Sequence, residues 1–181
     1  MQYTSGVSKT GLKYLIRDIE LTDAPKLLDY INTLSLEQTF ILLQGEQKSL
    51  EDEQKYIQDL LDKMKLGQTI ALIVECNGEL IGHATLGLRS RVESHVGSIA
   101  ISLSINYRGQ GIGKVFLTKL IELGKTKLAG LKIIELGVFG NNIQAIHLYE
   151  SLGFMQYGSL LNGILHRGKY VDHLLMYQII R

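Results

Sequence analysis

The chain has 181 residues, 45% of them hydrophobic and 20% charged, which is enough for one domain with a buried core. Its 19 Lys and Arg nearly balance its 18 Asp and Glu, so charge gives no reason to expect a nucleic acid as partner. The single cysteine, Cys76, excludes an internal disulfide and favours a reducing compartment. Since no run approaches the roughly 18 apolar residues of a membrane span, we expect a soluble, cytoplasmic protein with no membrane partner.

The chain reads as a short arm followed by one domain. Residues 1–11 are small and polar and predict a flexible N-terminal arm. Residues 12–181 contain no repeat, linker or low-complexity tract and predict a single domain. The elements expected in chain order are a strand over 12–21, helices over 25–36 and 49–65, strands over 69–76, 80–89 and 97–105, a helix over 111–127, a strand over 131–139, a helix over 143–152, and two strands within 155–181.

Local signals support several of these elements. Pro25 suits the first turn of a helix, where its missing N–H has no partner to lose. Ser49 precedes two acidic residues, a typical helix start. Asn77-Gly78 between two apolar runs is a strong hairpin signal. Together they predict an α/β (α+β) fold, in which antiparallel hairpins flank a strand–turn–helix–strand core.

The most informative segment is the strand over 97–105 with the glycine-rich turn that follows it. Bulky residues alternate with Ala100, Ser102 and Ser104, so one face is narrow and suits either a closely packed neighbour or a slender ligand. The turn reads Arg108-Gly109-Gln110-Gly111-Ile112-Gly113 and opens a helix. Its glycines expose backbone N–H groups at the positive end of the helix, which favours a phosphate or pyrophosphate.

The same turn lacks the features of two common phosphate-binding motifs. It does not end in the Gly-Lys-Ser/Thr of a nucleoside-triphosphate loop. Its glycines also lack the setting of a dinucleotide-binding fingerprint, because no first βαβ unit with a suitably placed acid surrounds them. Arg108 and Lys114 can add charge-assisted contacts to an anion.

Two segments resemble those of a known superfamily. Arg-x-x-Gly-x-Gly at Arg108, Gly111 and Gly113 resembles the acetyl-coenzyme A (acetyl-CoA) pyrophosphate loop of the GNAT superfamily of N-acetyltransferases. The segment 142–154 resembles its Asn-x-x-Ala-x-x-Leu-Tyr-x-x-x-Gly-Phe motif, and the whole resemblance covers residues 12–177. It implies a central mixed, mostly antiparallel twisted sheet of about six to seven strands flanked by about four helices.

The resemblance also implies the chemistry. The subgroup that this chain resembles acts on small amines or amino acids, so it implies a small-molecule amine as acceptor, acetyl-CoA as cosubstrate and no metal. Backbone groups of the strand would pair with the pantetheine arm, as an added strand would. The cofactor-binding residues that it implies are Ser102, Leu103, Arg108, Gly109, Gln110, Gly111, Ile112, Gly113, Lys114, Asn142 and Tyr149.

Tyr149 would be the general acid that protonates the leaving thiolate. A phenol with a pKa of about 10 is protonated at neutral pH and can donate; alternatively, Tyr149 is simply a core aromatic of an amphipathic helix. The acceptor amine must lose a proton before it attacks the thioester directly. The backbone N–H of Leu103 would stabilise the oxyanion that forms.

The base that deprotonates the amine is not evident from the sequence. Many protein N-terminal acetyltransferases of the superfamily carry a glutamate at the position of Gly137, and glycine cannot act as a base. Glu135 is the nearest carboxylate on that strand, unless it is a surface residue. His95 is a second candidate, unless it is an exposed or capping histidine. Ile105 is a further departure, because the family often has proline there.

Two other functions fit parts of the pattern. A protein N-terminal or lysine acetyltransferase would keep the cofactor loop, although Gly137 argues against it. A non-catalytic acyl-CoA sensor would keep the loop and need neither Tyr149 nor a base. The loop between the first two helices (37–45), the 89–93 stretch and the C-terminal turn (161–170) are expected to recognise the acceptor. The C-terminal sheet edge offers a surface for pairing with a second copy as a homodimer.

Overall fold

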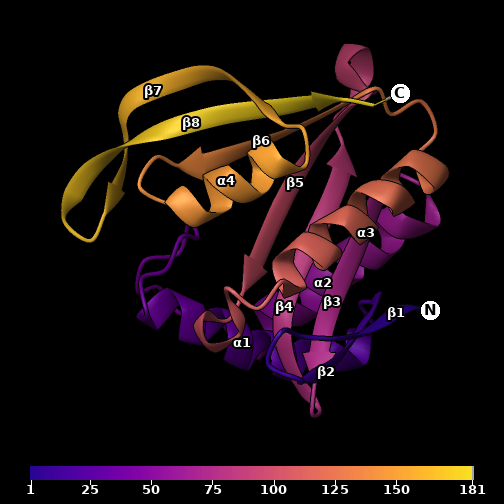
Figure 1. The fold of residues 1–181 in the computed structure, drawn as a ribbon. Coiled ribbons are helices and arrows are strands. Elements are labelled where there is room, and N and C mark those ends of the chain that lie inside the picture. The colour runs from indigo at the N-terminus through magenta and orange to yellow at the C-terminus, as the bar shows by residue number, and fades with distance from the viewer. Residues whose placement is uncertain (181) are drawn as a thin grey trace.

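A computed structural model describes residues 1–180 and folds them into a sheet with helices on both sides. The strands are β1 (Gln2–Val7), β2 (Lys13–Asp18), β3 (Thr69–Cys76), β4 (Glu79–Leu88), β5 (Val96–Leu103), β6 (Ile133–Phe139), β7 (Met155–His166) and β8 (Lys169–Ile179). The helices are α1 (Ala24–Leu36), α2 (Leu50–Lys65), α3 (Ile112–Lys127) and α4 (Ile143–Ser151). Over the described residues, the eight strands form one sheet in the order β1-β2-β3-β4-β5-β6-β8-β7 (Figure 1).

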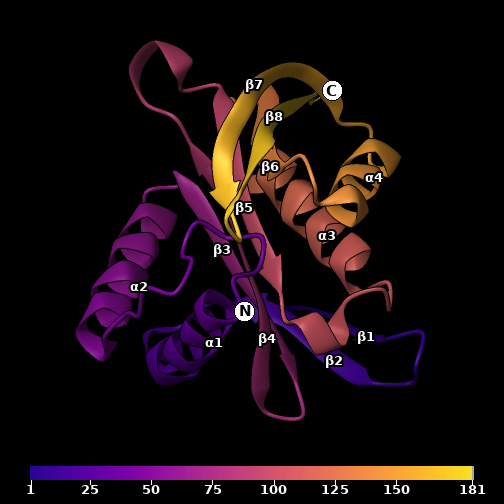
Figure 2. The same cartoon turned by 90° about the vertical axis from the view of Figure 1, so that its left-hand side faces the viewer.

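Helices α1 and α2 cover one face of the sheet, and α3 and α4 cover the other (Figure 2). The alternation of β3 explains this arrangement, because successive strand residues point to opposite faces. Ile70, Leu72 and Val74 pack with the apolar face of α3, whereas Ala71 and Ile73 pack with α1 and α2. Each face of the sheet therefore has its own apolar core.

The pairing between β5 and β6 is the one parallel pairing among the described strands, and it is short. Val96–Ser98 pairs with Ile133–Glu135. Beyond these residues β5 continues beside β4 to Leu103, while β6 continues beside β8 to Phe139. The two central strands therefore diverge and leave an opening in the middle of the sheet (Figure 1).

The observed elements confirm the predicted fold class, a mixed and mostly antiparallel sheet flanked by helices. The sheet has one strand more than the upper estimate, because Gln2–Val7 pairs with β2. The expectation of a flexible arm over 1–11 is therefore wrong for Gln2–Val7, which form an edge strand. Backbone hydrogen bonds to β2 hold this edge strand, so it needs no alternating apolar side chains. Its mostly small and polar residues therefore gave no strand pattern in the sequence.

Helix α3 approaches the sheet closely because glycine replaces a side chain at Gly124. A Cβ added there would lie 2.5 Å from Cδ2 of Leu86 and 3.3 Å from Cδ2 of Leu131. Leu86 is fully buried in the core between α3 and the sheet, so it has little room to move. This contact sets how deeply the helix that follows the glycine-rich turn sits on β4.

We expect Gly124→Ala to lower the free energy of unfolding by about 1–2 kcal/mol. A Cβ only 2.5 Å from the buried Leu86 places the overpacking cost in the upper part of its usual range, about 2–3 kcal/mol, and the gain in helix propensity returns about 1 kcal/mol of it. Urea unfolding measures the difference, with Lys125→Ala at the next, exposed position of α3 as the control. An unchanged or increased stability of Gly124→Ala would show that Leu86 does not limit the approach of α3.

Candidate functional site

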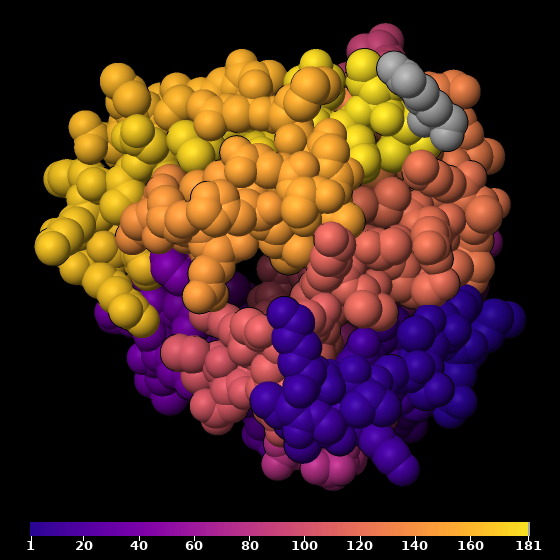
Figure 3. All heavy atoms as spheres, viewed as in Figure 1, coloured from indigo at the N-terminus to yellow at the C-terminus, as the bar shows by residue number. Residues whose placement is uncertain are grey.

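A cavity of about 510 Å³ lies at the opening between the diverging strands. The space-filling view shows the hollow between the orange surface of the β6–α4 segment and the pink surface of the segment after β5 (Figure 3). Its walls come from four parts of the chain: the α1–α2 loop, the short 3₁₀ turn after β5, the glycine-rich turn, and the start of α4 with the residues before it. The lining residues are Phe40, Ile105, Arg108, Gly109, Asn141, Asn142, Ile143 and Gln144.

The glycine-rich turn has the backbone conformation that its sequence requires. Gly109 has a φ of 73° and Gly111 a φ of 87°, both in the left-handed region that glycine tolerates best. Gly111 is the N-cap of α3, so the unpaired N–H groups of the first helical turn begin here. A Cβ added at Gly109 would meet nothing within 4 Å, which leaves room for a ligand beside the backbone. Ile105, in place of proline, begins a short 3₁₀ turn and lines the cavity.

Arg108 ties this turn to the end of β5. Its Nε donates a hydrogen bond of 2.8 Å to the carbonyl oxygen of Leu103. Burial lowers the pKa of the guanidinium, which nevertheless remains charged at neutral pH. Arg108 therefore positions the loop as well as supplying positive charge to the cavity wall.

The N-terminal hairpin contacts the same turn, a contact that the sequence did not predict. The backbone N–H of Lys9 donates to the carbonyl oxygen of Gln110 over 3.1 Å. The hydroxyl of Thr10 donates to Oε1 of Gln110 over 2.6 Å. The segment that was expected to be a loose arm thus braces the glycine-rich turn from outside.

The start of α4 brings the first residues of the second motif to the cavity, whereas Tyr149 lies in the core beneath the helix. Asn142 is the N-cap of this helix, and its Oδ1 accepts a hydrogen bond of 3.3 Å from the N–H of Ala145. Tyr149 is 7% exposed, and its ring centroid lies 5.9 Å from that of Phe154. Burial raises the pKa of Tyr149 to about 12. The residue is a core aromatic that also keeps its phenol proton at neutral pH.

Strand β5 presents its small face to α1. The hydroxyl of Tyr30, a buried residue of that helix, donates to Oγ of Ser102 over 2.8 Å. Ser102 and Leu103 lie beyond the residues that pair with β6. The β5 edge facing away from β4 is therefore free of strand partners there, within the part of the chain that the structure describes, and can pair with an extended ligand.

The two candidate bases lie in different places. The carboxylate of Glu135 accepts from the Arg89 guanidinium, from Oγ of Ser98 over 2.9 Å and from the Tyr157 hydroxyl over 3.4 Å. His95 immediately precedes β5 at the end far from the opening, about 23 Å along the strand from Ser102 at 3.3 Å per residue. The structure does not bring His95 to the cavity. The carboxylate of Glu135 is already hydrogen-bonded to three donors.

Two of the loops expected to recognise the acceptor converge at the mouth of the cavity. The α1–α2 loop meets the β7–β8 hairpin, where Nε of Arg167 donates to the carbonyl oxygen of Gln38 over 3.1 Å (Figure 2). Phe40 packs at 4.9 Å from the His166 ring and at 5.9 Å from the ring of Phe139. These contacts give the cavity an aromatic wall on the side of the sheet that α1 and α2 cover.

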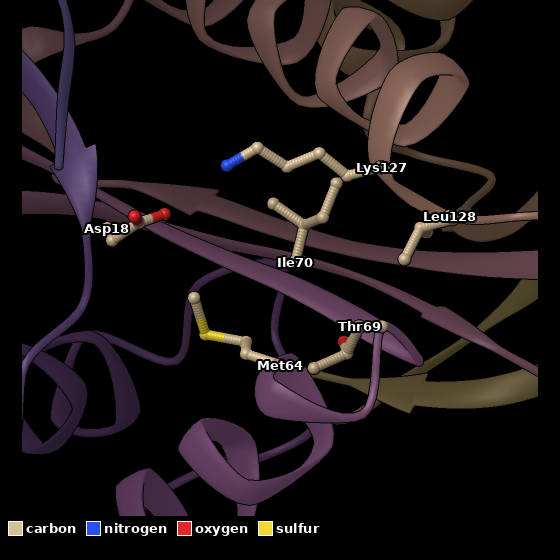
Figure 4. A pocket seen from close by; sticks show the side chains of 7 residues that line it. Asp18, Met64, Thr69, Ile70, Lys127 and Leu128 are labelled. Atoms are coloured by element: carbon tan, nitrogen blue, oxygen red, sulfur yellow. The ribbon is translucent and has the colours of Figure 1, made fainter.

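A second, small cavity lies away from this site. It has a volume of about 90 Å³ and contains none of the predicted site residues. In Figure 4, Lys127 extends over Ile70 toward Asp18, and its Nζ lies 4.7 Å from the ring centroid of Tyr3. This cavity is a gap between β2, β3 and the end of α3.

Residues 1–180 show neither a metal-binding cluster nor a membrane-spanning helix. No group of three or more His, Cys, Asp or Glu side chains is arranged to hold a metal ion there. Within the same residues, none of the helices has the length and apolar character needed to cross a membrane.

Known proteins resemble this chain in sequence and in fold. The L-amino acid N-acetyltransferase AaaT of Escherichia coli is 30% identical over 121 residues, 66% of this chain and 72% of that protein. The spermine/spermidine N(1)-acetyltransferase of Bacillus subtilis is 35% identical over 88 residues, 46% of this chain and 57% of that protein. The match thus spans little more than half of the length of the latter relative.

The agreement in structure extends over nearly the whole chain. The crystal structure of an acetyltransferase of the GNAT family from Streptococcus pneumoniae superposes with a TM-score of 0.84 and 28% identity, covering 93% of this chain and 99% of that one. The family model described as acetyltransferase (GNAT) family matches residues 32–154, which is more than half of the chain. The glycine-rich turn and the α4 motif both lie within this match, and the chain therefore belongs to the GNAT family of acetyltransferases.

Proposed function

We propose that the protein transfers the acetyl group of acetyl-CoA to a primary amine of a small molecule, an amino acid or a polyamine. The observation that carries this proposal is the cavity between the diverging strands, which joins the glycine-rich turn, the 3₁₀ turn after β5 and the start of α4. Relatives named as L-amino acid and as spermine/spermidine acetyltransferases support these two acceptor classes.

The walls of the cavity suit an elongated acyl thioester with a pyrophosphate. The free edge of β5 at Ser102 and Leu103 can pair with the amides of the pantetheine arm. The N–H groups from Gly109 to Lys114, at the positive end of α3, can bind the pyrophosphate. Asn142 lies across the cavity on α4, where it can contact the arm near the thioester.

The proposed reaction is a direct attack on the thioester. The lone pair of the acceptor nitrogen attacks the carbonyl carbon, and the backbone N–H of Leu103 stabilises the oxyanion. The C–S bond then breaks, and the hydroxyl of Tyr149 gives its proton to the thiolate. The acceptor nitrogen loses its excess proton, which returns through solvent to the tyrosinate. Because burial raises the pKa of Tyr149 to about 12, the phenol is in its proton-donating form throughout the neutral range.

A small acceptor fits this site better than a protein terminus does. The contact between Arg167 and Gln38 ties the β7–β8 hairpin to the α1–α2 loop and narrows the approach. Phe40 reaches into the cavity from the same side. An extended peptide would have to displace this contact, whereas the aliphatic stem and amine of an amino acid or polyamine need no such movement.

Acetyl transfer is tested by incubating the protein with acetyl-CoA and measuring free thiol release with a panel of L-amino acids, spermine, spermidine and short peptides. We expect turnover with members of the amino acid or polyamine group and none with the peptides. Tight binding of acetyl-CoA without turnover on any acceptor would instead identify an acyl-CoA sensor.

Gly111→Asp should abolish acetyl-CoA binding. The new carboxylate would stand at the N-cap of α3, repel the pyrophosphate and place a side chain where the φ is 87°. Isothermal titration calorimetry measures the loss, with Gly111→Asn as a matched control for shape and backbone strain. If the aspartate variant retained wild-type affinity, the turn would not be the pyrophosphate site.

Tyr149→Phe should lower kcat by about 100-fold, the lower end of what a general acid contributes. The acetyl-CoA Kd should change by no more than about tenfold, the amount that one hydrogen bond supplies. Steady-state kinetics measures kcat, and calorimetry measures the Kd for acetyl-CoA. Phe154→Leu is the control, because it alters the ring that packs against Tyr149 and leaves the Tyr149 hydroxyl in place. An unchanged kcat would remove Tyr149 as the proton donor.

A further inference from the structure

Gly137 occupies an unusual place for a glycine. It lies in the middle of β6, paired with Leu175 of β8, where a glycine weakens the strand because it has no side chain to pack. Its φ is not among the positive values of the chain, so the backbone conformation does not require glycine. The reason must lie in the space beside it.

That space is filled by the side chain of His173. The three atoms that a Cβ at Gly137 would meet first all belong to this imidazole, and the Cβ would overlap its Nε2. His173 stands opposite Phe139 in the β6–β8 register, diagonal to Gly137 and on the same face of the sheet. Strand β8 therefore places an imidazole in the space beside Gly137, where β6 itself has no side chain.

The face that carries His173 leads to the cavity. Its register partner Phe139 packs against Phe40, which lines the cavity. Val138 points the other way, into the core beneath α3 and α4. His173 thus lies on the side of the opening opposite to Tyr149 on α4, beside the aromatic wall that an acceptor would meet.

We propose that His173 is the general base of the reaction, an inference that rests on the acetyl transfer proposed above. Its Nε2 takes a proton from the ammonium group of the acceptor, and the freed nitrogen lone pair attacks the thioester carbonyl. The N–C bond forms, the C–S bond breaks, and the thiolate takes the proton of Tyr149. The second proton lost by the acceptor nitrogen returns through solvent to the tyrosinate, and the imidazolium releases its proton to solvent. Imidazole is the side chain that most often performs this step.

The other candidates are placed less well. Glu135 shares the strand and the face with Gly137, but its carboxylate already accepts hydrogen bonds from Arg89, Ser98 and Tyr157. This network joins β5, β6 and β7, so Glu135 fits a structural role. His95 precedes the far end of β5.

The test compares His173→Gln with the wild-type protein, using an acceptor amine that the wild-type protein acetylates. We expect kcat/KM to fall by about 100-fold or more, as the loss of a general base predicts, with the Kd for acetyl-CoA unchanged. His147→Gln, an exposed histidine of α4, is the matched control. Wild-type kcat/KM in His173→Gln would overturn the inference while leaving acetyl transfer intact. Absence of any transfer by the wild-type protein would overturn both.

Two rescue experiments separate a base from a residue that only supports the fold. Free imidazole in the buffer should raise the rate of His173→Ala in proportion to its concentration. Adding Gly137→Glu to His173→Ala should also restore part of kcat/KM, because the glutamate Cβ would occupy the space that the imidazole has left. If His173→Ala binds acetyl-CoA normally but neither imidazole nor the glutamate raises its rate, His173 is not the base.

Discussion

The divergence of β5 from β6 is the constraint on which the site depends. After a short parallel pairing, each strand keeps its other neighbour, β4 or β8, and the two halves of the sheet separate. A backbone edge is thereby left without a strand partner in the interior of the described sheet, where unpaired N–H and C=O groups are costly. An extended ligand that supplies the missing hydrogen bonds would stabilise the opening, so the architecture itself favours a cosubstrate with an amide-bearing arm.

Glycine has three distinct uses in this fold. Gly109 and Gly111 adopt positive φ values and expose the backbone at the start of α3. Gly124 lets the same helix approach Leu86 in the core. Gly137 makes room for a side chain from the next strand. The first use follows from conformational freedom and the other two from volume, and only the first leaves a recognisable motif.

The proposed acceptor side combines a polar network with an aromatic wall. Glu135, held by three donors, joins the strands where they still pair, and Phe40 with Phe139 covers the point where they have separated. The β7–β8 hairpin reaches the α1–α2 loop through Arg167, so segments more than a hundred residues apart define the approach to the cavity. This wall and the glycine-rich turn come from different segments, so the wall can be varied without disturbing the turn.

The sequence by itself determined the family and the fold class and predicted the glycine turn as a cofactor loop, because helix starts, the Asn77-Gly78 hairpin and the glycine turn are local signals. It missed β1 and the contacts of Lys9 and Thr10 with the glycine turn, since an edge strand of small polar residues has no periodicity to detect. Only the tertiary structure placed His173 over Gly137 and His95 at the far end of β5. Strand register and divergence decide those positions, and they arise from pairing between distant segments that no local pattern encodes.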